Sequence, residues 1–264
     1  MAVVIPEKQL VVSVGISKTS YRQVLELCRE WVSERRRSNP TQARYICVTS
    51  VHGIMMAHDD SEIATVFNRA DIATPDGMPV VWALRSFGAR DQQRVYGPTL
   101  MLEICKQAAE SGHSIFLYGG RADTLPQLIQ NLRERFPLLR VAGSYSPPFR
   151  TLTETEDQEI QDKVRESDAD IVLVGIGAPK QEKWMYAHRD SLRGVVMVGV
   201  GAAFDFYAGR TPQAPGWMQR NGLEWLFRLM MEPVRLWKRY LLITPRFLPL
   251  WARQRWRYSR YGPR

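Results

Sequence analysis

The segment DIVLVGIGAPKQEKWM, residues 170–185, combines three local patterns in succession. Its apolar, β-branched run at 171–174 has the composition of a buried strand. Glycines follow directly at 175 and 177, and a helical pattern begins near residue 179. The segment VVMVGVGAAFD, residues 195–205, has the same order. A strand that opens through glycine into a helix is a unit of parallel α/β sheets.

The same alternation of strand and helix patterns extends through residues 1–210. Apolar, β-branched runs predict strands at 10–14, 45–48, 114–118, 139–142, 171–174 and 195–198. Helical segments are predicted near 20–36, 77–87, 98–111, 124–136, 154–166 and 179–190. We therefore expect an α/β core, residues 1–210, with a parallel sheet and helices on both of its faces. Because ligands of such sheets bind at the carboxyl ends of the strands, we expect the chemistry at the strand-to-helix turns.

Composition restricts the class of protein. With 264 residues, 45% hydrophobic and 24% charged, the chain can form a sizeable core, which argues against global disorder. Its three cysteines form no CxxC pair or Cys/His cluster, so neither a disulfide framework nor a structural zinc site is expected. The N-terminal segment lacks a signal-peptide pattern, and the apolar run at 194–204 is too short to span a bilayer. These features predict a cytoplasmic protein.

The excess positive charge is confined to the last fifth of the chain. Residues 211–264 contain 11 Lys and Arg, two acids and five of the eight tryptophans, whereas residues 1–210 contain equal numbers of acids and bases. Charged residues recur every three or four positions in 221–243, which predicts a helix with one polar stripe that Pro233 kinks or splits. We expect residues 211–264 to form a basic helical appendage that meets an anionic membrane surface. Packing of the appendage on the core is the alternative.

The motif TPDGMP, residues 74–79, places Asp76 between a short apolar segment and a helical pattern. A carboxylate in a cleft at such a position can take a proton from an attacking hydroxyl group, as a general base. Asp is also common in turns and at helix N-termini, so an N-cap is the alternative interpretation of Asp76.

Two glycine-rich turns, at 175–177 and 199–201, are candidates for a nucleotide site. Glycine lets the backbone approach a diphosphate closely, and the N-terminus of the following helix offers N–H groups to it. Asp205 can accept hydrogen bonds from a ribose or a base. Neither turn has the complete GxGxxG or Walker pattern, so structural turns, with Asp205 as a cap, are the alternative. The residues predicted to bind the nucleotide are Gly175, Gly177, Lys180, Gly201 and Asp205.

Arg94 begins the segment RVYGPT, which leads into a predicted helix. A guanidinium group pairs with phosphate oxygens through two parallel hydrogen bonds, so Arg94 is a candidate anion clamp. An ordinary surface arginine is the alternative. The four histidines and the acidic residues lack the spacing of metal ligands, and we expect no metal site.

Four motifs, taken in this order, resemble those of one family. They are TPDGMPVV at 74–81, RVYGPTLM at 94–101, GIGAPKQEKWM at 175–185 and GVGAAFDFYAGRTPQAPGWMQRNGLEWLFRLMMEPVRLWKR at 199–239. The set resembles the WecG/TagA/CpsF glycosyltransferases of bacterial surface-polysaccharide assembly. The resemblance implies a Rossmann-like core with a C-terminal helical appendage, the fold called GT-E. It also implies inverting transfer of a sugar from a UDP-sugar to a polyprenyl-diphosphate-linked saccharide, at the inner face of the plasma membrane and without an obligatory metal.

The resemblance also assigns roles to single residues. The family's proposed catalytic base falls on Asp76. The family's pocket threonine falls on Thr49, but the asparagine that accompanies it is replaced here by Val51. Of the arginines thought to meet the lipid diphosphate, the third falls on either Lys238 or Arg239. The substrate-binding residues implied in this way are Thr49, Arg94, Gln181, Arg228, Arg235 and Arg239.

Several alternatives stay open at this level. Arginine alternates with aromatic residues at 246–264, as in proteins that bind single strands, but no nucleic-acid-binding motif accompanies them and we expect no nucleic acid partner. An NAD-dependent oxidoreductase would need the missing third glycine. A UDP-binding module without catalysis is a third alternative. The transferred sugar (a hexose, an N-acetylhexosamine or a uronic acid), the exopolysaccharide it would serve and a homo-oligomeric state are not readable from the sequence.

Overall fold

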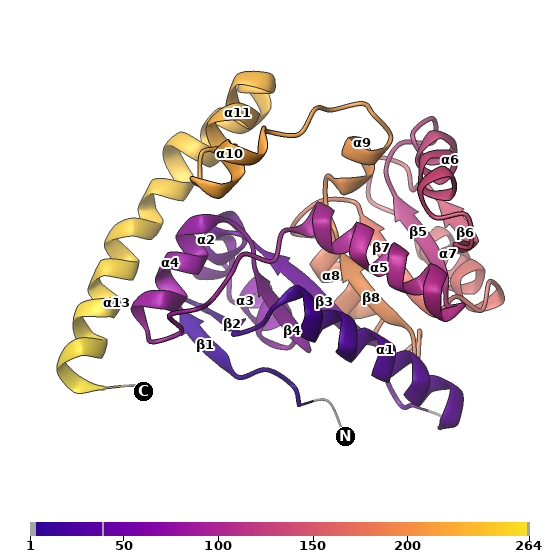
Figure 1. Cartoon of the computed structure of the whole chain (residues 1–264), viewed down its shortest axis with the longest axis horizontal. Coiled ribbons are helices and arrows are strands. Elements are labelled where there is room, and N and C mark those ends of the chain that lie inside the picture. Colours follow the sequence, from indigo (N-terminus) through magenta and orange to yellow (C-terminus); the bar gives the residue numbers. More distant parts are fainter. Residues whose placement is uncertain (1–3, 39, 263–264) are drawn as a thin grey trace.

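Six parallel strands form the central sheet of the computed structural model, which describes residues 4–38 and 40–262 (Figure 1). Their order across the sheet is β4–β3–β8–β7–β5–β6. The strands are β3 (Arg44–Thr49), β4 (Ile72–Pro75), β5 (Ser114–Gly119), β6 (Arg140–Tyr145), β7 (Ile171–Gly175) and β8 (Val196–Gly199). The predicted α/β class with a parallel sheet is confirmed.

The sheet separates two apolar cores. Because side chains alternate along a strand, Tyr45 and Cys47 of β3 enter one core and Ile46 enters the other. The first core is covered by α2 (Val51–Asp59), α3 (Ser61–Asn68), α4 (Met78–Ser86), α7 (Glu154–Glu166) and α8 (Lys180–Ala187). The second is covered by α1 (Tyr21–Arg37), α5 (Gly97–Ser111), α6 (Leu125–Arg135) and α9 (Ala203–Tyr207). Helices therefore lie on both faces, as predicted.

The strand predicted at 10–14 is wrong. Those residues contain the turn of an antiparallel hairpin, β1 (Lys8–Val11) and β2 (Val14–Ser17), in which Val11 pairs with Val14. The apolar run continues through the turn, so composition did not reveal the reversal. The hairpin lies beside β4, where Ser17 Oγ accepts a hydrogen bond from the Ala73 backbone N–H at 3.1 Å.

A crevice is expected where the connections of neighbouring strands diverge. The chain passes from β5 outward to β6, but from β7 in the opposite direction to β8. In such sheets ligands bind between the carboxyl ends of the two diverging strands. Here those ends are Gly119 and Gly175, and the Gly120 N–H donates to the Gly175 carbonyl at 3.1 Å.

The C-terminal part consists of short helices and one longer one. It contains α10 (Gly216–Arg220), α11 (Glu224–Met231), α12 (Pro233–Trp237), a π-helical turn η1 (Lys238–Ile243), a 3₁₀ turn η2 (Thr244–Arg246) and α13 (Phe247–Tyr261). The predicted break at Pro233 is confirmed, because Glu232 before it leaves the helical conformation. Pro249 falls in the first turn of α13, where proline is tolerated, so the helix continues to Tyr261.

Within residues 211–262, the C-terminal part packs on the rest of the protein (Figure 1). Phe247 is 1% exposed within the first core, and Arg246 forms two hydrogen bonds of 2.6 and 2.8 Å with the carboxylate of Asp59. No helix within the described residues is long and apolar enough to cross a bilayer. The division into a core and an appendage at residue 210 stays a prediction.

Candidate active site

A cleft of about 1050 Å³ lies at the carboxyl ends of the strands. The ends of β7 and β8 and the turns after them form its floor, and residues of the C-terminal part form its other side. Most residues predicted for the site line this cleft: Asp76, Gly175, Gly177, Lys180, Gln181, Gly201, Asp205, Arg228, Arg235 and Arg239. A smaller chamber of about 100 Å³ adjoins it and shares Asp76.

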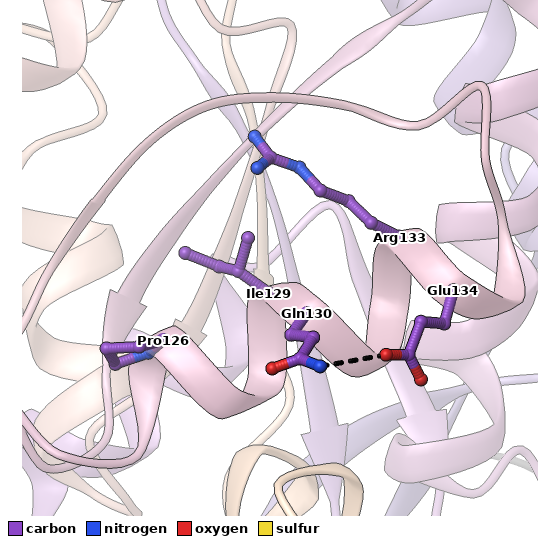
Figure 2. Close-up of a pocket in the computed structure, with 5 residues that line it drawn as sticks. All are labelled: Pro126, Ile129, Gln130, Arg133 and Glu134. Atoms are coloured by element: carbon purple, nitrogen blue, oxygen red, sulfur yellow. Dashed lines mark hydrogen bonds between the residues drawn. The ribbon is translucent and has the colours of Figure 1, made fainter.

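A separate surface hollow lies on α6, and none of the predicted site residues lines it. Pro126, Ile129, Gln130, Arg133 and Glu134 line it, all from one helix, and Gln130 is bonded to Glu134 at 2.9 Å (Figure 2). An open groove along one helix brings no second element to a ligand. We therefore place the site in the cleft at the strand ends.

Asp76 follows β4 directly and is held by the neighbouring strand. Its backbone N–H donates to the Thr49 carbonyl at 2.9 Å. Gly77, at φ +87°, is the N-cap of α4, so the alternative of Asp76 as an N-cap is wrong. The Asp76 side chain is 19% exposed and lines both the cleft and the chamber. The carboxylate is thus half-buried but open to a ligand.

Arg94 is the partner of Asp76. Its Nε and Nη2 both lie 2.8 Å from Asp76 Oδ1, and Nη2 also lies 2.7 Å from Glu224 Oε2 at the start of α11. The guanidinium sits 4.1 Å from the ring centroid of Tyr96. Burial disfavours the charge of Arg94, but the carboxylates of Asp76 and Glu224 outweigh it and raise the Arg94 pKa.

The structure excludes the alternative of a surface arginine, whereas the role of Arg94 as an anion clamp stays a prediction. Its side chain is only 15% exposed, so it is no surface arginine. Its guanidinium is occupied by two carboxylates, so it is not free to clamp a phosphate in this conformation. Sequence reasoning placed Glu224 in the polar stripe of a helix and did not connect it with the site. Only the tertiary fold places it against Arg94.

The two glycine turns are tied together by Gln181. Its Oε1 accepts a hydrogen bond from the Gly201 N–H at 3.1 Å, and its Nε2 donates to Glu182 Oε1 at 2.8 Å. Gly177, at φ +80°, and Gly201, at φ +57°, adopt the conformation that favours glycine. Gln181 is only 3% exposed, so its amide supports the floor of the cleft and presents little surface to a ligand.

Lys180 and Asp205 lie at the edge of this floor. Lys180 is exposed at the first position of α8. Asp205 is half-buried within the first turn of α9, whose N-cap is Ala202, so Asp205 is not the predicted cap. Both side chains line the cleft.

Thr49 does not line either cavity. Its side chain is fully buried, and its hydroxyl donates to the Cys47 carbonyl at 3.2 Å. The next residue, Ser50, lines both cavities instead. His52 lines the chamber, and burial, followed by the charge of Arg239, lowers its pKa to about 4. His52 is therefore neutral at pH 7.

Three arginines of the C-terminal part close the cleft from the side opposite the glycine turns. Arg228 stacks over Phe206 at 5.8 Å, Arg235 pairs with Glu232, and Arg239 Nη2 donates to Ser50 Oγ at 3.4 Å. Burial lowers the Arg239 pKa. Of the two alternatives for the third cation, Arg239 lines the cleft, whereas Lys238 is absent from its lining.

Sequence reasoning also missed one wall of the cleft. The loop at 147–153 and Asp157 of α7 line the cleft beside Trp184. His188 Nε2 lies 2.7 Å from Asp157 Oδ2, which connects this wall to the first core. The loop has no regular pattern, so nothing in its sequence indicated its position.

Two further features concern metals and cysteines. Within residues 4–38 and 40–262, no three His, Cys, Asp or Glu side chains gather as a metal-ligand group. The three cysteines, Cys28, Cys47 and Cys105, are free and buried.

Comparison with known proteins gives two consistent results. Residues 9–261 match the glycosyl transferase WecG/TagA/CpsF family. The chain is also similar to an N-acetylglucosaminyldiphosphoundecaprenol N-acetyl-beta-D-mannosaminyltransferase of Bacillus subtilis (strain 168), with 32% identity over 70% of either chain. A protein of the same description from Bacillus spizizenii (strain ATCC 23059 / NRRL B-14472 / W23) is 33% identical over 67% of either chain.

Proposed function

Because the chain belongs to the WecG/TagA/CpsF family of glycosyltransferases, we propose that it transfers a sugar from a UDP-sugar to a saccharide on a polyprenyl diphosphate, with Asp76 as general base. One observation carries this proposal: Asp76, the glycine turns and the appendage arginines line a single cleft. The family excludes the oxidoreductase alternative. The names of the relatives support, as the acceptor, an N-acetylglucosamine that is linked through a diphosphate to a polyprenol.

The proposed step needs the acceptor oxygen, the anomeric carbon and the leaving UDP oxygen in line. The acceptor hydroxyl oxygen attacks the anomeric carbon, the bond from that carbon to the UDP oxygen breaks, and UDP leaves with the electron pair. Asp76 takes the hydroxyl proton. Arg94 Nε donates a hydrogen bond to Oδ1, and Arg94 Nη2 also lies 2.8 Å from Oδ1, so Oδ2 is the oxygen available for the proton. Attack from the face opposite the leaving group inverts the anomeric centre.

Negative charge grows on the leaving diphosphate and must be stabilised. Backbone N–H groups of the turn at 175–178 and the start of α8 lie on one side of the cleft, with Lys180 at its edge. Arg228, Arg235 and Arg239 lie on the other. We propose that these cations take the place of a metal ion. Transfer should therefore persist in EDTA, and a requirement for added Mg²⁺ would contradict this part of the proposal.

The appendage is proposed to bring the cleft to the membrane that holds the acceptor. Its charge is strongly positive, and its helices expose large apolar side chains. The most exposed of them in α10 to η1 are Trp217, Met230, Val234, Leu241 and Leu242. We place the protein at the inner face of the plasma membrane.

Asp76→Asn tests the proposed function. The substitution keeps the shape and the Oδ1 acceptor but removes the base. We expect transfer to fall by at least about a hundredfold, the lower end of the range for general-base catalysis. UDP affinity, measured by calorimetry, should change little because the proposed contacts to the diphosphate come from the turn at 175–178 and the appendage arginines, not from Asp76.

A panel of donors should accompany that variant: UDP-N-acetylmannosamine, its uronic acid, UDP-N-acetylglucosamine and UDP-glucose, with a short-chain polyprenyl-diphosphate sugar as acceptor. The donor used identifies the sugar. If the wild type binds UDP but transfers none of these sugars, the non-catalytic UDP-binding module is correct. Normal turnover by Asp76→Asn would refute the role of Asp76.

A further inference from the structure

Helix α11 buries an acid instead of its apolar residues. Within α11, all of whose residues the structure describes, Glu224 is the single buried residue, at 8% exposure. Leu226, Met230 and Met231 of the same helix are exposed. Burial of a carboxylate is unfavourable unless the charge is paired and hydrogen-bonded. The position of Glu224 therefore requires an electrostatic explanation.

The explanation is a chain of three charged groups across the chamber. Glu224 Oε2 lies 2.7 Å from Arg94 Nη2, and the same nitrogen lies 2.8 Å from Asp76 Oδ1. The side chains of Glu224, Arg94 and Asp76 are 11%, 15% and 19% exposed. Tyr96 closes the face of the guanidinium at 4.1 Å. One arginine thus joins the appendage to the residue that follows β4.

Glu224 also determines which oxygen of Asp76 is engaged. Arg94 approaches Asp76 with Nε and Nη2 on the same atom, Oδ1. An arginine free of other partners prefers a fork, with one nitrogen on each carboxylate oxygen. Because Glu224 holds Nη2, the guanidinium is kept from rotating into that fork, which would occupy Oδ2 as well.

We propose that Glu224 is a positioning residue for the transfer reaction: through Arg94 it keeps one oxygen of Asp76 available, and it does so only when α11 is docked. This inference rests on the proposed function and deepens it. It means that the docking of the appendage on the core determines whether an oxygen of Asp76 is available to take the proton. Glu224 itself lines the chamber and is not among the residues that line the cleft.

The first experiment measures steady-state transfer by Glu224→Gln. The amide keeps the size but loses the charge that holds Arg94. We expect kcat to fall by at least about tenfold, as for a misplaced catalytic group, while KM for the UDP-sugar stays within about threefold. The matched control is Asp59→Asn, which removes another ion pair between core and appendage, that with Arg246, outside the cleft. This control should keep the wild-type kcat.

A double-mutant cycle separates positioning from packing. In an Arg94→Gln background, Glu224→Gln should cause no further loss of kcat, because its effect passes through Arg94. If the fold-losses of kcat in the two single variants multiply in the double variant, Glu224 acts independently of Arg94 and only packs α11. That result would overturn the inference. If Glu224→Gln does not fold, Arg94→Lys serves instead. The single ammonium cannot span both carboxylates, so the same loss of kcat is expected.

The outcomes distinguish this inference from the function beneath it. An active wild type with an unaffected Glu224→Gln variant refutes the inference alone. A wild type that transfers no sugar from any donor refutes both. If Asp59→Asn lowers kcat as much as Glu224→Gln does, activity requires docking of the appendage in general. That result would also overturn the specific role of Glu224.

Discussion

Glu182 is a fully buried carboxyl group on α8 with one occupied oxygen. Oε1 accepts the Gln181 amide at 2.8 Å, and Oε2 has no hydrogen-bond partner within the described part of the chain. Burial raises the Glu182 pKa to about 7. Burial thus favours the protonated, neutral form of Glu182. This carboxyl group is hydrogen-bonded to Gln181, which joins the two glycine turns.

The raised pKa makes stability depend on pH. Below pH 4.5 the folded and unfolded states are both protonated at Glu182. Between pH 4.5 and about 7 only the unfolded state ionises, so the free energy of unfolding falls, by about 3 kcal/mol in total above pH 7. Glu182→Gln should therefore be more stable than the wild type at pH 8, and nearly equal at pH 5, in urea denaturation. Glu166→Gln, at an exposed position, is the control. Parallel pH dependences for Glu182→Gln and the wild type would contradict this assignment.

Gly119 is required at the point where β5 and β7 meet. At φ +128°, a Cβ atom on it would lie 2.5 Å from the Gly175 carbonyl carbon, which is backbone and cannot move aside. Gly112, at φ +67°, has nothing within 4 Å of a Cβ and supplies the control for backbone strain alone. Strain at a positive φ is about 1–2 kcal/mol.

Gly119→Ala should consequently lower the free energy of unfolding by at least about 2 kcal/mol more than Gly112→Ala, since the clash adds to the strain. UDP affinity should also fall for Gly119→Ala, because the adjacent Gly175 turn lines the cleft. Urea denaturation and calorimetry measure the two effects. Equal losses for both variants would mean that the strands separate without penalty.

At the scale of elements, the sequence predicted what local pattern determines. Long apolar runs such as 171–174 identified the central strands, because a strand buried on both faces has no polar positions. Helices α2 and α3, which follow β3, were missed. Only one residue separates α2 from α3, Asp60, which is the N-cap of α3. The strand order could not be predicted, because it depends on pairings between distant segments and on no local signal.

Helix α13 shows how an element gains its position from one anchor. Phe247 at its start is 1% exposed and stacks on Trp251 at 6.1 Å, whereas the neighbouring Leu248 is 55% exposed. Phe247→Ala should lower the free energy of unfolding by about 3–5 kcal/mol, the effect of a cavity in a core. Leu248→Ala should change it by less than about 0.5 kcal/mol. If the two variants unfold at the same urea concentration, α13 is not part of the cooperative core.

At the scale of the molecule, the candidate site was predictable because strand-end motifs converge in any parallel sheet. Asp76 and both glycine turns follow from that rule, and they do line one cleft. The Arg94–Glu224 contact and the wall at 147–153 were not predictable, because they depend on how a distant segment folds back. The burial of Thr49 likewise depends on the direction in which one side chain leaves β3.

The separation of charge predicts how the whole molecule meets a membrane. Residues 211–264 carry all the excess positive charge, and exposed arginines of α13 include Arg253, Arg257 and Arg260. Each cation near an anionic leaflet contributes about 1 kcal/mol, and salt screens it. Binding to anionic vesicles should therefore weaken with salt, and replacing these three arginines by Gln should lower the affinity by about a hundredfold. The matched control replaces Arg22, Arg133 and Arg140, exposed on the core, and changes the net charge equally. Equal weakening of vesicle binding by both sets of substitutions would mean that net charge alone matters. If binding does not depend on the salt concentration, the basic residues of the appendage do not drive it, and the appendage only packs on the core.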